Sequence, residues 1–175
     1  MKTKTFISLV IAMFCFTAIQ AQDIEKDVQR IRIYYNILKA EIESETNELI
    51  CFYVEDNKFE RQKEGEAYTN TKIYFYYTDT PDGVDLKMII FESKRGIFST
   101  YAEYMFDEGS LSFGFKQHNE DASKAERLYQ QNGRVVRYSV GNVDKDIEES
   151  EYKIAMFNKT ASQMLTVFNS YMLRD

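Results

Sequence analysis

Apolar residues recur at intervals of three or four near both ends of the chain. Between residues 23 and 43 they form one face of a helix: Ile24, Val28, Ile31, Tyr35, Leu38 and Ile42. Between residues 146 and 172 a similar pattern is formed by Ile147, Ile154, Phe157, Ala161, Met164, Phe168 and Met172. Asp146, followed three residues later by Glu149, resembles a capping box. The pattern predicts an N-terminal and a C-terminal amphipathic helix.

The region between the two predicted helices alternates apolar and polar residues, which is typical of half-buried strands. Runs rich in Tyr, Phe, Ile and Val lie at about 49–54, 71–77, 85–92, 97–106, 111–117, 123–130 and 134–140. Most connections are short and contain glycine, so neighbouring strands must run antiparallel. The polar residues 55–70 fit either a hairpin or a loop. The sequence predicts an α+β fold, an antiparallel meander sheet of six or seven strands with an N-terminal and a C-terminal helix.

A glycine at position 109 marks the turn of one hairpin. A two-residue turn there places Tyr104 opposite Phe113, so that apolar side chains share one face and Glu103 lies on the other. A slip by one residue would mix the two sets. The register therefore predicts a solvated Glu103, with Lys116 near enough for a weak ion pair.

A second hairpin turns at Asn132-Gly133, the dipeptide preferred in type I′ turns. This turn places Tyr129 opposite Val136 and leaves Glu126 and Arg137 together on the other face. Their diagonal separation allows an ion pair worth about 0.2–1 kcal/mol on a wet surface.

The two hairpins share a layout. Residues 101–113 have Tyr-x-Glu-Tyr-x-Phe-Asp-x-Gly-x-Leu-x-Phe, and residues 126–137 have Glu-Arg-x-Tyr-x-x-Asn-Gly-x-x-x-Arg. This pattern resembles one found in small exported bacterial proteins of unknown function. The resemblance covers roughly residues 70–140. It implies a secreted or periplasmic α+β domain and carries over no functional residue.

Residues 1–21 have the layout of a secretory signal peptide. Two lysines precede an apolar run, and small residues lead to a predicted cleavage site after Ala21. The apolar run is too short to span a membrane, since spanning takes about 20 residues. Phe14 directly before Cys15 disfavours lipidation, because a small residue is expected at that place. We therefore expect a periplasmic or secreted protein with no transmembrane segment.

The remaining residues 22–175 are predicted to form one domain. Residues 1–21 hold two lysines and no acid, so their removal changes the net charge from −6 to −8. An acidic exported chain with no basic tract is a poor candidate for binding nucleic acid or an anionic membrane. Cys51 is then the one cysteine left, which excludes an intramolecular disulfide. Its apolar neighbours predict a buried, unreactive thiol.

The common patterns of catalysis and metal binding are missing from the sequence. His118 is the single histidine, and the acidic run 144–151 has Glu149 where a calcium loop needs glycine. There is no Gly-x-Ser-x-Gly elbow, phosphate-binding glycine loop or dinucleotide-binding fingerprint. Glu103 and Glu126, two strands apart, would lie about 10 Å from each other, at or beyond the upper limit for an inverting glycosidase pair. The sequence predicts no catalytic residue, no metal and no cofactor.

Tyrosine is abundant, with 13 residues, and tryptophan is absent. A core edged with tyrosines explains this composition, and so does a binding surface. In the strand 72–77, alternation places Phe75 on the face that we expect under both helices. The opposite face is expected to be open and to hold the candidate ligand-binding residues: Tyr74, Tyr76, Glu103, Glu126 and Arg137.

Two classes of function remain open. The first is an exported non-catalytic binding module, which holds a protein, peptide or small apolar ligand on the sheet face or in a pocket between sheet and helices. The alternatives are a hydrolase that uses acidic residues and an exported inhibitor of another enzyme. A pocket large enough for a ligand, as opposed to a fully packed interior, would favour the binding module.

Overall fold

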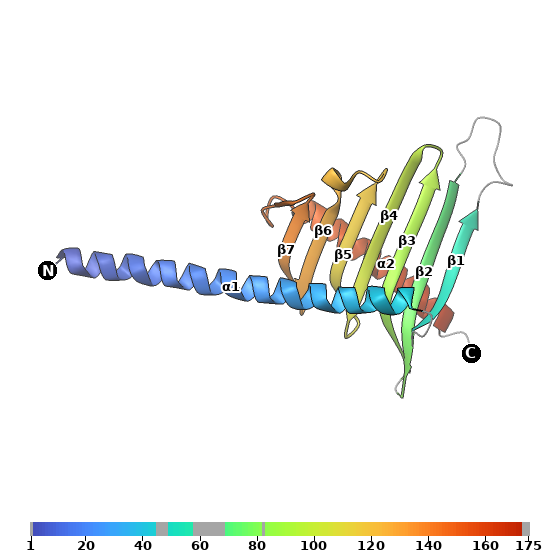
Figure 1. Cartoon of the computed structure of the whole chain (residues 1–175), viewed down its shortest axis with the longest axis horizontal. Helices are drawn as coiled ribbons and strands as arrows, with labels where there is room; N and C mark the ends of the chain where they lie inside the picture. Colours follow the sequence, from blue (N-terminus) through green and yellow to red (C-terminus); the bar gives the residue numbers. More distant parts are fainter. Residues whose placement is uncertain (1, 45–48, 58–68, 82, 173–175) are drawn as a thin grey trace.

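The computed structural model describes the backbone of residues 2–44, 49–57, 69–81 and 83–172, with side chains from residue 22 onward. Two long helices accompany one eight-stranded antiparallel sheet, whose strands follow one another in chain order (Figure 1). The elements are α1 (Lys2–Glu43), β1 (Ile50–Asn57), β2 (Thr69–Thr80), β3 (Gly83–Arg95), β4 (Phe98–Asp107), β5 (Ser110–His118), η2 (Ala122–Lys124), β6 (Glu126–Gln131), β7 (Arg134–Val140), β8 (Val143–Asp144) and α2 (Glu151–Met172). The predicted α+β meander is confirmed, with eight strands in place of six or seven. Of the stretch 55–70, residues 58–68 lie outside the described part.

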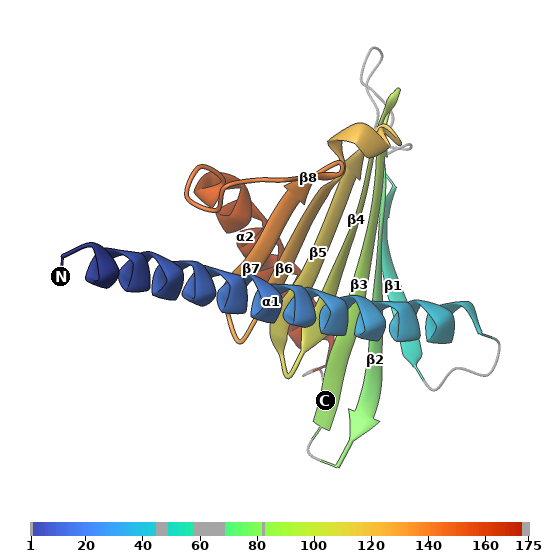
Figure 2. The ribbon, with the colours of Figure 1, turned by 60° about the vertical axis from the view of Figure 1, so that its left-hand side comes forward.

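The two helices cover opposite faces of the sheet, so the fold has three layers (Figures 1 and 2). α1 crosses one face, and its N-terminal part extends past the β7 edge of the sheet (Figure 1). α2 packs on the other face. The expectation that both helices share one face, leaving the other open, is therefore wrong. Tyr74 and Tyr76 lie on the face that α1 covers, and both are half-buried.

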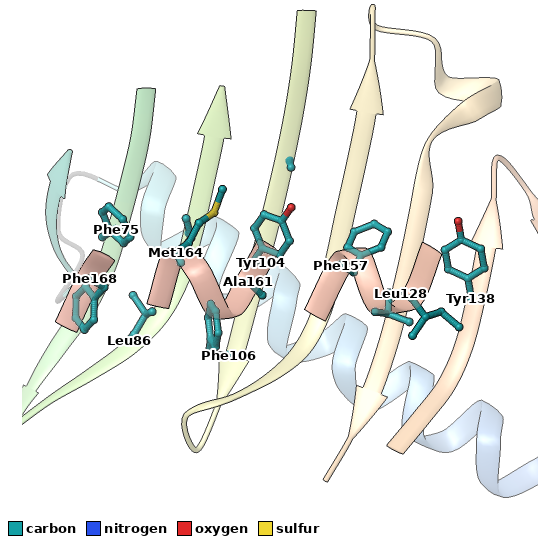
Figure 3. Packing of buried hydrophobic residues seen from close by; sticks show 13 residues of the cluster. Phe75, Leu86, Tyr104, Phe106, Leu128, Tyr138, Phe157, Ala161, Met164 and Phe168 are labelled. Atoms are coloured by element: carbon teal, nitrogen blue, oxygen red, sulfur yellow. The ribbon is translucent and has the colours of Figure 1, made fainter. Parts of the chain in front are cut away.

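Aromatic side chains fill the layer between the sheet and α2 (Figure 3). Phe75 is fully buried there, as predicted, with its ring 4.9 Å from that of Phe52 and 5.9 Å from that of Phe168. Gly114 lies directly beneath Phe157: a Cβ at this position would lie 2.7 Å from the Phe157 ring. A glycine in β5 therefore lets α2 approach the sheet closely.

The layer between the sheet and α1 is built from the stripe that the sequence predicts for the N-terminal helix. Val28, Ile31 and Leu38 are buried against the sheet. Their neighbours are buried residues of four strands, Met88, Met105, Phe113 and Tyr129 among them. Burial of apolar area on both faces supplies the main stabilisation of a chain in which no disulfide joins the described residues.

Three hairpins carry a β-bulge at the same end of the sheet. In each of β3, β5 and β7 one residue has no partner in the ladder: Lys87, Ser112 and Val136. A bulge places two consecutive residues on one side of the strand and bends the strand locally. Val136 and Arg137, for example, both lie on the α1 side, between Val135 and Tyr138, which pack on the α2 side.

Because of the bulges, the observed registers differ from the predicted ones. Both turns are correct: Glu108-Gly109 and Asn132-Gly133 have positive φ at both positions, as a type I′ turn requires. Beyond the bulge, however, Phe113 pairs with Met105 and lies on the α1 side, away from Tyr104. Tyr129 pairs in the same way with Arg137 in place of Val136.

Two local predictions also change. α2 begins at Glu151, five residues later than the pattern suggests, and Asp146 instead accepts a hydrogen bond from the Glu149 backbone N–H within a preceding turn. Cys51 is exposed: it lies in the edge strand β1 opposite Tyr76, on the α1 side of the sheet, while its neighbour Phe52 packs in the α2 layer. The expected burial of Cys51 is therefore wrong.

Candidate functional site

An open pocket of about 410 Å³ lies beside α1, between the helix and the central strands. We call it the α1 pocket. Its lining comes from four elements: Arg32, Tyr35 and Asn36 of α1, Tyr101 and Glu103 of β4, Phe113 and Phe115 of β5, and Arg127 and Tyr129 of β6.

Ordinary side-chain periodicity brings these residues together. Positions three and four apart share one face of a helix, so Arg32, Tyr35 and Asn36 point to the same flank of α1. Alternate residues of a strand share one face of a sheet, which accounts for the two residues that each strand supplies. The bulge at Ser112 turns the β5 pair, Phe113 and Phe115, toward α1.

The buried carboxylate of Glu103 forms the base of the α1 pocket. Glu103 is 2% exposed and accepts three hydrogen bonds. The Tyr35 hydroxyl donates to Oε2 at 2.6 Å; the Tyr101 hydroxyl, at 2.5 Å, and Lys39 Nζ, at 3.0 Å, donate to Oε1. These donors satisfy the buried charge, and two of them tie α1 to β4.

The two tyrosines hold their protons firmly. Burial, followed by hydrogen bonding to the Glu103 carboxylate, raises the pKa of Tyr35 and of Tyr101 far above the usual value for tyrosine. Both hydroxyls are therefore donors at neutral pH. The arrangement is a fixed, preorganised polar base and not a set of groups poised to exchange protons.

Aromatic rings and two guanidinium groups form the walls. The ring of Phe113 lies 5.0 Å from that of Tyr35 and 5.1 Å from that of Tyr129. Arg32 Cζ lies 5.5 Å from the centre of the Tyr129 ring, and Arg127 Cζ lies 5.2 Å from the centre of the Phe115 ring. Cation–π contacts of this kind fix the position of a guanidinium.

The chain matches no protein-family model, no curated protein and no solved structure. Its function must therefore be argued from the geometry of the site.

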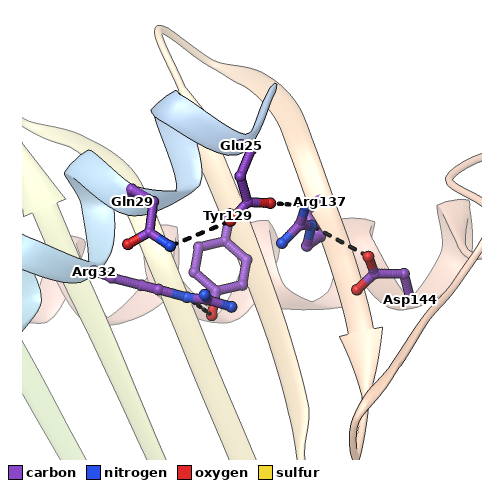
Figure 4. Close-up of polar contacts among 6 residues, drawn as sticks. All are labelled: Glu25, Gln29, Arg32, Tyr129, Arg137 and Asp144. Atoms are coloured by element: carbon purple, nitrogen blue, oxygen red, sulfur yellow. Dashed lines mark hydrogen bonds and ion pairs between the residues drawn. The ribbon is translucent and has the colours of Figure 1, made fainter. Parts of the chain in front are cut away.

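Of the predicted ligand-binding residues, Glu103 is the one that lines the α1 pocket. Glu103 is buried, whereas the sequence predicted that it is solvated. The bulge in β5 and the docking of α1 cover its face. Arg137 lies nearby on the same side of the sheet, where its guanidinium pairs with Glu25 at 2.7 Å and with Asp144 at 3.3 Å (Figure 4). It joins α1 to β7 and β8.

The other three candidates lie elsewhere. Glu126 lies on the α2 side, where it accepts a hydrogen bond from the Tyr138 hydroxyl at 2.5 Å and pairs with Lys153 at 3.4 Å. It therefore shares a face with neither Glu103 nor Arg137, and the expected Glu126–Arg137 pair is wrong. Tyr74 and Tyr76 of β2 pack at the other end of the α1 layer, away from the pocket lining.

Sequence reasoning missed most of the pocket, including both of its arginines. Arg32 and Asn36 lie one helical turn apart, at the border of the apolar stripe. Once the helix is known to lie on the sheet, this position indicates that both side chains lie beside the sheet. Arg127 gave no such signal. A register without the bulge pairs Arg127 with Tyr138, whereas in the structure it pairs with Ser139 on the α1 side.

Neither metal binding nor membrane spanning is indicated in the described part of the chain. No group of three His, Cys, Asp or Glu side chains is placed there to hold a metal ion. His118, the single histidine, lies at the end of β5, where its Nδ1 is 2.9 Å from the Thr100 hydroxyl. No helix among the described residues is long and apolar enough to cross a membrane.

Two further hollows flank the α1 pocket. A larger one, of about 460 Å³, is lined almost entirely by polar strand residues and shares Tyr101 with the α1 pocket. Another, of about 360 Å³, lies on the opposite flank of α1, between Tyr34 and the hairpin turns. Neither combines a buried charge with stacked guanidinium groups, so the α1 pocket is the strongest candidate site.

Proposed function

We propose that this protein is an exported, non-catalytic binding module that holds a small organic molecule in the α1 pocket. The observation that carries the proposal is the lining itself: aromatic walls over a polar base whose donors and acceptors already have partners. Ligand pockets of proteins likewise combine aromatic or apolar walls with a few placed polar groups, and have volumes of roughly 300–1,000 Å³. Export rests on the signal-peptide layout of residues 1–21.

The engagement of Glu103 supports binding over hydrolysis. A general acid or base must reach the substrate with a free proton or lone pair, whereas the Glu103 carboxylate accepts hydrogen bonds from three side chains of the protein. Glu126 cannot serve as its partner, because the sheet separates the two carboxylates.

A neutral fluorescent dye tests the proposal. The fluorescence of phenylnaphthylamine brightens in apolar sites and so reports its binding. We expect saturable binding of the dye to the exported protein. Asn36→Trp, which fills the mouth of the α1 pocket, should weaken binding by about tenfold or more, a loss of about 1.4 kcal/mol.

Ile33→Trp is the matched control, since Ile33 lies on the outer side of the same helix with 59% of its surface exposed. This variant should bind the dye as the wild type does. Absence of saturable binding, or equal losses in the two variants, would refute the α1 pocket as a ligand site.

A further inference from the structure

The charges of the α1 pocket are unbalanced. Glu103 is offset by Lys39, its partner at 3.0 Å. Arg32 and Arg127 remain, and neither forms an ion pair with a carboxylate of the described residues. The pocket thus holds two guanidinium groups that are not directly paired with a carboxylate, in a protein whose net charge is −6.

Other arginines near α1 differ in this respect. Arg137 pairs with Glu25 and Asp144, and Arg30 pairs with Asp27 at 3.6 Å. The two pocket arginines instead lie against the rings of Tyr129 and Phe115.

The guanidinium groups retain donors for a ligand. Arg32 Nε donates to the Tyr129 hydroxyl at 3.4 Å, and Arg127 Nη1 donates to the Gly141 carbonyl at 2.9 Å. A guanidinium has five N–H groups in a planar fork, so most of the donors of each remain available. Such forks match the two oxygens of a carboxylate or a similar oxyanion.

We infer that the ligand of the α1 pocket is a small organic anion: a flat apolar body that lies against the aromatic walls, with one oxyanion group held by Arg32 and Arg127. This inference rests on the proposed function and names its ligand class. One guanidinium comes from α1 and the other from β6, so the anion also bridges helix and sheet. A carboxylate, a sulfonate or a phosphate ester on such a body shares the required chemistry.

A pair of dyes that differ in one charged group tests the inference. Anilinonaphthalene sulfonate has the same rings as phenylnaphthylamine and carries an added sulfonate. At low salt we expect the anionic dye to bind the exported protein about tenfold or more tightly than the neutral dye. The difference should shrink as salt is added, because exposed charges are screened.

Variants assign the preference to the two arginines. In Arg32→Gln with Arg127→Gln the anionic dye should bind no better than the neutral dye, because the charges that favour the sulfonate are gone. Arg30→Gln, on the other flank of α1, should keep the full preference. Binding of the neutral dye shows that the double variant is folded. If the double variant does not bind the neutral dye, the single variant Arg32→Gln replaces it, because Arg32 is exposed. This single variant is expected to remove about half of the difference in binding free energy between the two dyes.

The outcomes separate the inference from the proposed function. Equal binding of the two dyes by the wild type, or a preference that survives in the double variant, would overturn the inference while the proposed function stands. Binding of neither dye would overturn both. Inorganic phosphate should not displace the anionic dye at millimolar concentration; displacement would show that the anion alone suffices and that the apolar body is not required.

Discussion

At the level of single residues, Glu103 is the side chain whose burial depends most on its hydrogen-bond partners. A buried carboxylate is costly unless the protein supplies hydrogen-bond donors. Here the donors come from two elements, Tyr35 and Lys39 from α1 and Tyr101 from β4. The same three contacts therefore stabilise the charge and hold the wall of the pocket in place.

Glu103→Gln should reduce the free energy of unfolding by about 1.5–3 kcal/mol, the range for hydrogen bonds to charged groups. The neutral amide removes the charge from these hydrogen bonds, and its N–H₂ group faces a partner that until then was a donor. Urea unfolding at neutral pH measures the loss. Glu92→Gln, an exposed carboxylate on the same face of the sheet, is the control and should change stability by less than about 0.5 kcal/mol. A loss for Glu103→Gln as small as that of the control would contradict the buried network.

The raised pKa of Tyr104 predicts that the free energy of unfolding falls at alkaline pH. Burial raises its pKa to about 12, and the side chain is 3% exposed. Between the ordinary tyrosine pKa of about 10 and the folded value, the unfolded chain loses this proton and the folded chain keeps it. Below pH 10 the wild type should therefore differ from Tyr104→Phe by a constant amount. Above pH 10 it should lose about 1.4 kcal/mol per pH unit relative to the variant. Urea unfolding from pH 8 to 11.5 tests this sign, and a constant difference throughout would refute it.

At the level of elements, the docking of α2 depends on the absence of a side chain at Gly114. Gly114→Ala would place a Cβ 2.7 Å from the Phe157 ring, in a layer that is closely packed. Overpacking of this kind costs about 1–3 kcal/mol.

A double variant tests this account. In a Phe157→Leu background the Gly114→Ala change should cost much less, because the clashing ring is gone. The two effects are therefore expected to be non-additive by about 1 kcal/mol or more. Chemical denaturation of all four proteins gives the coupling, and strictly additive losses would mean that α2 approaches β5 differently.

The elements also show what the sequence could and could not predict. The two helices, the turns at 108–109 and 132–133 and the antiparallel order depend on local patterns, and they are confirmed except for the start of α2, which lies at Glu151 and leaves Ile147 outside the helix. The bulges were invisible because Leu111-Ser112-Phe113 alternates as well as any regular strand. One unpaired residue then moved Phe113 and Phe115, two of the nine residues that line the pocket, to the other face. Which face each helix covers is a long-range choice that no local pattern encodes.

At the level of the whole molecule, α1 is the layer that closes the second face. Its contacts combine a buried stripe, the Glu103 network and the ion pair of Glu25 with Arg137 (Figure 4). If α1 docks as a unit, a polar side chain in its buried stripe should detach α1 while the sheet and α2 stay folded.

Val28→Asp should expose α1, because Val28 is fully buried and a carboxylate has no partner there. Amide hydrogen exchange should show lost protection in residues 24–43, with protection retained in β4–β6 and α2. Ile33→Asp, on the exposed side of the same helix, should leave the exchange pattern unchanged. Equal effects of the two substitutions would show that α1 is not held by its buried stripe.

The place of α1 in the chain has a consequence for folding order. The hairpins join residues close in sequence, whereas the Tyr35–Glu103 bond joins residues 68 apart and the Arg137–Glu25 pair residues 112 apart. Closing such long loops costs entropy before any contact forms, so long-range docking is slow compared with hairpin formation. α1 cannot find its binding face until β3 to β6 have been synthesised and paired. α1, which is made before the sheet, is therefore expected to reach its native place after the sheet has formed.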